Sequence, residues 1–241
     1  MSDRMIKILV LMKDAMPRLL TQCAKITLPM TVLSFVCGLL LALVLALVQV
    51  ANIKGLKQFA RFYVWVFRGT PLLVQIFIIF FGLPSLGIMI DGFPAAVIAF
   101  SLNFAAYNSE VLRSAIQAVP VGQTEAAYMV GLNYFQLMTR IVLPQAARIA
   151  FPPLFNSLIG LVKDTSLAAT ITVIDMLAVS KQIAARYYEP MPMYVETAII
   201  YLVICTVLTK VQSYLEKKLE WKQPEDVGEE KPALSDTAKL E

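Results

Sequence analysis

The sequence predicts an all-α integral membrane protein with about five transmembrane helices. Hydrophobic residues make up 58% of its 241 residues, and charged residues only 16%. Residues 26–50 contain no charged side chain, and a run of about 20 apolar residues is enough to cross a hydrocarbon core. Because backbone groups in lipid must bond within their own segment, runs of this length indicate helices rather than strands.

Five apolar runs have the length of a membrane span: residues 26–50, 59–83, 93–116, 149–172 and 193–211. The transmembrane domain is therefore expected over residues 26–217. Residues 1–25 mix basic and apolar side chains and predict an amphipathic segment at the membrane surface. Residues 174–189 predict a short helix outside the membrane, and residues 218–241 predict a polar, disordered tail.

The distribution of lysine and arginine predicts the orientation in the membrane. More of these residues lie in the cytoplasm if the loop near Ala51, the loop between the third and fourth spans and the C-terminus are all placed there. This choice puts the N-terminus outside. The basic residues before the first span argue for the opposite orientation.

Composition also excludes several classes of function. The chain has no histidine, which removes the commonest general base, metal ligand and proton relay. Its three cysteines, Cys23, Cys37 and Cys205, lie in or beside apolar runs without metal-ligand spacing. A formal net charge of +4 is ordinary for a membrane protein and gives no reason to expect nucleic acid as a partner.

Residues 122–145 form a polar segment, rich in small residues, between the third and fourth spans. Three groups of residues are spaced along it: Glu125, Ala126 and Ala127, then Gly131, and finally Ile141, Leu143 and Pro144. The two alanines leave a helix surface bare enough for another protein to approach. Gly131 permits a sharp change of direction between two short helices, and Pro144 is expected to end the second of them. An ordinary amphipathic linker is the alternative interpretation.

This spacing resembles the cytoplasmic coupling loop, or EAA loop, of bacterial ABC importer permeases. Residues 67–75 (FRGTPLLVQ), 106–116 (AYNSEVLRSAI) and 161–171 (LVKDTSLAATI) are similar to three other signatures of the polar amino acid family of these permeases. The resemblance implies an EAA loop at about residues 118–148, between helices 3 and 4. It also implies a bacterial inner membrane location, with the C-terminus in the cytoplasm.

The resemblance further implies a set of partners. These are a second permease subunit, identical or paralogous, cytoplasmic ATP-binding subunits and an extracytoplasmic amino acid binding protein. The chain has no phosphate-binding loop of the form GxxxxGK[ST]. No cofactor is therefore expected in this chain, and ATP and Mg²⁺ are expected to be used by the partner ATPase. A basic amino acid, glutamine, histidine and cystine all remain possible substrates.

Polar residues at membrane depth form two predicted layers, because charged groups in a bilayer should face the bundle interior and find partners. The inner layer holds Arg68 and Glu110, which are expected to form a structural or gating ion pair. The outer layer holds Gln75, Asn103, Lys163 and Asp164, and with Tyr107 and Thr165 these residues form a candidate substrate pathway.

In the outer layer, Lys163 or an amide suits an amino acid carboxylate, and Asp164 suits its ammonium group. Two alternatives need no ligand: Lys163 and Asp164 compensate each other or snorkel to the surface, and Thr165 bonds a neighbouring backbone carbonyl.

These observations favour the permease subunit of an ATP-driven importer that works by alternating access. A secondary carrier driven by an ion gradient is the first alternative, although no inverted repeat is visible. A membrane-embedded enzyme using Glu110, Lys163 or Asp164 is the second, although the chain lacks a paired-carboxylate or nucleophile arrangement.

Overall fold

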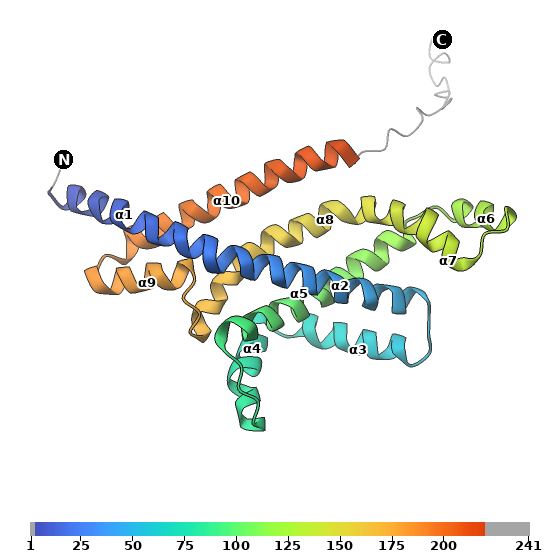
Figure 1. The fold of residues 1–241 in the computed structure, drawn as a ribbon, viewed down its shortest axis with the longest axis horizontal. Coiled ribbons are helices and arrows are strands. Elements are labelled where there is room, and N and C mark those ends of the chain that lie inside the picture. Colours follow the sequence, from blue (N-terminus) through green and yellow to red (C-terminus); the bar gives the residue numbers. More distant parts are fainter. Residues whose placement is uncertain (1–2, 220–241) are drawn as a thin grey trace, which may run out of the picture.

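The computed structural model describes residues 3–219, and every regular element within that range is a helix. The helices form an elongated bundle, with α1 and α9 at one end and α6 and α7 at the other (Figure 1). Three helices in the described range are long and apolar enough to cross a membrane, or up to five if each of two bent pairs is one span. The all-α membrane fold is therefore confirmed. From residue 220 onward, the predicted polar tail lies outside the described residues.

The first long helix is continuous from Arg4 to Val50. It consists of α1 (Asp3–Gln22), a π turn (Cys23–Thr27) and α2 (Leu28–Val50). The amphipathic segment expected over residues 1–25 thus runs directly into the first span. Its buried side chains Ala15, Leu19 and Cys23 recur every fourth residue and pack in one cluster with residues of α9 and α10.

The second span is broken rather than continuous. It comprises α3 (Leu56–Gly69), α4 (Leu72–Phe77), a π turn (Ile78–Gly82) and a 3-10 turn (Leu83–Leu86). The two parts meet at 105°, and α4 points away from the long axis of the bundle (Figure 1). Thr70 is extended, with φ −120° and ψ 144°, as expected before a proline that disfavours the helical conformation of its predecessor. The span expected over residues 59–83 is therefore divided into two helices, because Pro71 stands at a break.

Three of the prolines that lie within continuous helix each follow a π turn by two residues. The turns are Cys23–Thr27, Ile78–Gly82 and Met138–Val142, and the prolines are Pro29, Pro84 and Pro144. Proline lacks an amide hydrogen and clashes with the carbonyl one turn earlier, and a widened π turn relieves both problems. The expectation that Pro144 ends a helix is therefore wrong.

α5 (Gly92–Gln117) packs along α2 in the centre of the bundle. Small residues let the two backbones approach closely, as is common between membrane helices. A β-carbon on Gly38 would lie 3.0 Å from Ser101 O and 2.9 Å from the Phe104 ring. Any larger residue at position 38 would push α2 and α5 apart.

The remaining helices follow in order along the chain: α6 (Val121–Met129), α7 (Tyr134–Leu137), α8 (Leu143–Asp164), a 3-10 helix (Thr165–Ile171), α9 (Met176–Tyr187) and α10 (Pro190–Leu219). Helical structure runs without a break from Tyr134 to Ile171. α9 confirms that a short helix forms within residues 174–189. Asp175 caps it, because its Oδ1 accepts a hydrogen bond from Ala178 N at 2.8 Å.

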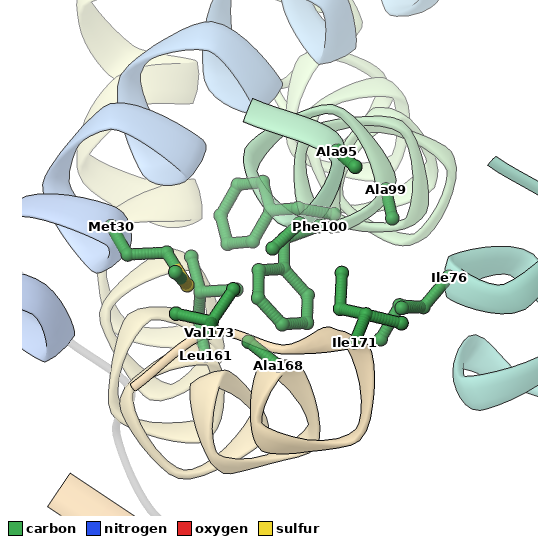
Figure 2. Packing of buried hydrophobic residues seen from close by; sticks show 11 residues of the cluster. Met30, Ile76, Ala95, Ala99, Phe100, Leu161, Ala168, Ile171 and Val173 are labelled. Atoms are coloured by element: carbon green, nitrogen blue, oxygen red, sulfur yellow. The ribbon is translucent and has the colours of Figure 1, made fainter. Parts of the chain in front are cut away.

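The largest core cluster surrounds Phe100 of α5, which has no exposed surface. Figure 2 shows Met30, Ile76, Leu161 and Ile171 gathering around it from different helices. This cluster joins α2, α4, α5 and the end of α8, so it holds the broken second span against the rest of the bundle.

Candidate functional site

The α6–α7 hairpin lies at one end of the bundle and contains the spaced motif (Figure 1). Gly131 has a φ of +80°, in the left-handed region that glycine adopts without strain. Its amide donates to Tyr128 O at 3.0 Å, and Leu132 N donates to Ala127 O at 3.1 Å, which closes the end of α6. Asn133 and Gln136 then form a capping box that starts α7. The change of direction expected at Gly131 is confirmed.

The motif residues differ in exposure. Glu125, Ala126 and Pro144 are exposed, and Ile141 and Leu143 are partly buried. Ala127 is only 2% exposed and packs with Leu137 and Val142. The bare surface expected of both alanines therefore exists at Ala126 only, because the α6 backbone turns the next side chain toward the bundle.

The hairpin also exposes large apolar side chains that the sequence pattern did not single out. The most exposed are Val121, Met129, Val130 and Phe135, each at least 70% exposed. Exposed apolar residues gathered on one feature mark a surface that another protein or the membrane covers. Their signal in the sequence is weak, since apolar residues are common throughout this chain.

Gln75 and Asn103 lie at the break in the second span. Gln75 Nε2 donates to Phe67 O at 2.8 Å and to Thr70 Oγ1 at 2.8 Å. Asn103 Nδ2 donates to Gln75 Oε1 at 3.0 Å. The two side chains therefore link the end of α3, the start of α4 and the middle of α5.

A polar cleft of about 430 Å³ lies between α4, α5 and α8. Asn103, Tyr107 and Asp164 line it, so the structure brings together three of the six residues of the predicted substrate pathway. Gln75, Lys163 and Thr165 are not among its lining residues.

A shared substrate site would require Lys163 and Thr165 to line the same cleft as Asp164, and neither residue does so. Lys163 is exposed outside the polar cleft, and the structure records no ion pair between it and Asp164, both of which it describes. Thr165 is fully buried and donates to Val162 O at 2.7 Å. The alternative that Thr165 bonds a backbone carbonyl is thus confirmed, while mutual compensation of Lys163 and Asp164 is not seen as a contact.

Asn108 is a cleft residue that sequence reasoning missed. It is 1% exposed, and its Nδ2 donates to Phe104 O at 2.9 Å. Its Oδ1 is buried without a hydrogen-bond partner among the described residues. A buried acceptor of this kind carries an energetic penalty unless a ligand or water bonds it. With the Asp164 carboxylate, it gives the polar cleft two acceptors.

A second, basic cleft of about 650 Å³ lies between α3 and α5. Lys57, Arg61, Arg68 and Arg113 line it, with Glu110 as the only acidic residue among the described ones that do so. Charged residues at membrane depth face protein or water rather than lipid. Tyr107 lines both clefts, so they adjoin at this side chain.

The ion pair expected between Arg68 and Glu110 is not found. Glu110 Oε2 instead accepts from Arg113 Nη2 at 2.7 Å and from Arg113 Nε at 3.1 Å. Arg113 lies one turn after Glu110 on the same helix, where such pairs form readily. Arg68 stacks over the Tyr107 ring, with its guanidinium carbon 5.4 Å from the ring centroid. The predicted pair of Arg68 with Glu110 was wrong, because Glu110 bonds Arg113, a nearer partner on its own helix.

Comparisons with known proteins agree with this architecture. Residues 38–221 match the family described as binding-protein-dependent transport system inner membrane component. The L-cystine transport system permease protein TcyB of Bacillus subtilis is 45% identical over 195 residues, which are 80% of this chain and 83% of that protein. The arginine transport system permease protein ArtQ of Bacillus subtilis is 40% identical over 196 residues, covering 81% and 90%.

Solved structures give the same result. An amino acid ABC transporter crystallised with histidines matches with a TM-score of 0.81 and 34% identity, covering 86% of this chain and 96% of that one. The MetNI methionine ABC transporter, in an inward-facing form, matches with a TM-score of 0.71 and 19% identity, covering 92% of this chain and 100% of that one. At that identity it supports the fold alone.

Proposed function

Because the chain belongs to the binding-protein-dependent transport system inner membrane components, we propose that it is the membrane-spanning permease subunit of an ATP-driven polar amino acid importer. The observation that carries the proposal is the α6–α7 hairpin: its exposed apolar residue Phe135 lies on the helix that continues without a break into α8, which lines the polar cleft. A surface that another protein can move is thus joined to a site that can hold a polar solute.

The mechanism proposed is alternating access. Cytoplasmic ATP-binding subunits dock on the hairpin, and their closure around ATP and Mg²⁺ moves it. Because α7 and α8 are continuous, this movement changes which side of the membrane the polar cleft faces. A second permease subunit, identical or paralogous, covers the charged face of α3 and α5. An extracytoplasmic binding protein delivers the amino acid.

In this proposal the polar cleft holds the head group of the substrate. Asp164 and Asn108 Oδ1 accept hydrogen bonds from the ammonium group, and Tyr107 contributes a phenolic hydroxyl. Lys163, the expected partner of the substrate carboxylate, lies outside the cleft lining. Arg68, which stacks on Tyr107, is the cation placed to take over this role. Cystine and arginine relatives match at similar identity, so family membership leaves the amino acid open.

The proposed orientation places α1 and α9 outside and the hairpin in the cytoplasm, within a bacterial inner membrane. Two observations support it: the excess of basic residues on the chosen inner loops, and the position of the hairpin at the end opposite α9 (Figure 1).

Gly131→Asp tests the coupling role in the complete transporter. A β-carbon at φ +80° is strained, although no atom lies within 4 Å of its position. We expect the protein to insert and assemble while substrate-stimulated ATP hydrolysis and uptake fall together. Gly122→Asp is the matched control, since Gly122 is an exposed α6 residue with equally open space and no positive φ.

Normal coupling in the Gly131 variant would refute the role of the hairpin. Uptake by this chain without any ATPase would instead favour the ion-coupled carrier.

A further inference from the structure

A third cleft, of about 460 Å³, lies between α1 and α9, at the end of the bundle opposite the hairpin (Figure 1). Arg18 of α1 and Arg186 of α9 both line it, together with Thr21, Gln22 and Gln182. None of the described residues that line this α1–α9 cleft is acidic. It therefore offers an excess of positive charge and hydrogen-bond donors.

The packing of the two helices places these side chains. On α1, Leu19 and Cys23 are buried against the bundle, and Arg18 and Gln22 each precede one of them. On α9, Val179 and Ile183 are buried, and Gln182 and Arg186 lie one turn apart beside them. The polar residues thus border the contact between the helices and form the walls of a groove.

Neither arginine of this cleft is neutralised by a carboxylate. The ion pairs that the structure records in residues 3–219 are Arg4 with Glu189 and Arg113 with Glu110. The guanidinium of Arg186 lies 5.7 Å from the Tyr187 ring centroid, a contact that orients the group without cancelling its charge. Two guanidinium groups without a carboxylate partner in one cleft favour an anionic ligand, and the planar fork of arginine suits phosphate oxygens.

The position of the cleft along the first helix is close to the lipid headgroup layer. Lys25 is the last charged residue before the charge-free run at residues 26–50, so it marks the edge of the hydrocarbon core. Arg18 lies seven residues earlier, about 10 Å further along the helix. The headgroup region extends roughly 5 to 8 Å beyond the core. The Arg18 backbone thus lies just beyond the outer margin of this region, within reach of a long arginine side chain.

Exposed tyrosines lie at the end of α9. Tyr187, Tyr188 and Tyr194 surround the connection between α9 and α10 and are 52%, 90% and 44% exposed. Tyrosine is enriched at membrane interfaces, where its ring meets acyl chains and its hydroxyl meets water. The end of α9 therefore has the composition of an interfacial belt.

We propose that the α1–α9 cleft binds the phosphate of an anionic phospholipid headgroup in the outer leaflet. Arg18 and Arg186 hold the phosphate oxygens from two helices, and Gln22 and Gln182 bond the glycerol hydroxyls of the headgroup. The lipid bridges α1 and α9, so it stabilises their contact. This site depends on the orientation proposed above but not on the transport activity.

Thermal unfolding of the intact transporter in neutral detergent tests the site, without substrate or ATP. Three additives are compared: phosphatidylglycerol, phosphatidylcholine and inorganic phosphate. We expect only phosphatidylglycerol to raise the unfolding midpoint, in a saturable manner. Arg18→Gln and Arg186→Gln should each raise its half-saturating concentration by about tenfold or more, the effect of losing one charge-assisted hydrogen bond. Lys181→Gln, an exposed α9 residue outside the cleft, should respond as the unmodified protein does.

Each contrary result decides against the proposal. An equal effect of inorganic phosphate would make the ligand a free anion rather than a headgroup. An unchanged lipid response in the double glutamine variant would remove the site. If that variant loses stimulation by the binding protein but keeps the lipid response, the cleft is a protein docking surface. Should the double variant fail to assemble, Arg18→Lys with Arg186→Lys retains both charges and must still weaken lipid binding.

Discussion

Gln75 Nε2 donates to Phe67 O at 2.8 Å, and this hydrogen bond spans the 105° bend between α3 and α4. The last carbonyls of a helix have no amide partner in a following turn. Unsatisfied carbonyls are costly in lipid, so a side-chain amide that bonds them permits the break. Gln75 thus has a structural explanation that requires no substrate.

Gln75→Leu should therefore lower the thermal stability of the protein in detergent. Leaving a buried carbonyl unsatisfied costs about 1 to 3 kcal/mol. Asn103→Ala, which removes only the contact with Gln75 Oε1, should have a smaller effect. If Gln75→Leu instead leaves the unfolding midpoint unchanged and alters uptake, Gln75 belongs to the substrate pathway.

Glu110 should couple energetically more strongly to Arg113 than to Arg68. Double-mutant cycles with Glu110→Gln, Arg113→Gln and Arg68→Gln, measured by unfolding in detergent, separate the two pairs. We expect a measurable coupling energy between Glu110 and Arg113, because their side chains are bonded at 2.7 Å. A stronger coupling of Glu110 to Arg68 than to Arg113 would favour the ion pair between the second and third spans.

Asp164→Asn should weaken transport without weakening the fold. If Asp164 binds the ammonium group of the substrate, losing its charge removes about 1.5 to 3 kcal/mol. The substrate concentration for half-maximal uptake then rises about ten- to a hundredfold, while basal ATP hydrolysis and the unfolding midpoint stay near their original values. Lys163→Gln is the adjacent control outside the polar cleft. Unfolding of Asp164→Asn, or an unchanged uptake curve, would contradict the substrate role.

Asp175 should make stability fall as pH rises from about 4 to about 6. Burial raises the pKa of its carboxyl to about 6, and the hydrogen bond from Ala178 N only partly offsets this. In that window the unfolded chain has lost the proton that the folded chain keeps, so each rise in pH favours unfolding. Above the folded-state pKa the carboxyl is ionised in both states, and the full free-energy cost of its charge in the fold is present.

Asp175→Asn should remove this pH dependence, because asparagine caps a helix as well as aspartate does and does not titrate. Unfolding midpoints measured across the window, for both proteins, check the prediction. Asp175→Ala loses the cap as well and should be less stable than Asp175→Asn at every pH. An identical pH profile for the asparagine variant would show that other groups cause any slope.

Apolar length predicted the position of the spans, and the backbone preference of glycine predicted the turn at Gly131. Sequence did not reveal how each proline is accommodated. Pro29 and Pro144 look no different from Pro71 in their apolar surroundings, yet π turns absorb the first two while the third stands at a break. The outcome depends on tertiary partners such as Gln75, which compensates the open carbonyls only in the folded bundle.

Only part of the candidate site could be predicted, because the sequence does not show which side chains meet in the folded bundle. Helical periodicity placed Asn103 and Tyr107 on an interior face, but it did not fix which neighbours they would meet. Lys163 and Asp164 are adjacent in sequence, so their side chains diverge around the helix and only Asp164 lines the polar cleft. Glu110 has a basic neighbour three residues away on its own helix, and membrane depth alone does not distinguish that partner from one on another span.

The unbroken helix from Tyr134 to Ile171 has a mechanical consequence. Phe135 at the hairpin and Asp164 at the polar cleft are separated by about 44 Å of helix. A rod of this length works as a lever, and a tilt of about 5° at one end displaces the other by about 4 Å. A small rotation imposed on the hairpin is thus amplified into a movement about as wide as an ammonium group, and the π turn Met138–Val142 and the prolines within α8 are the points along the helix where bending would absorb it.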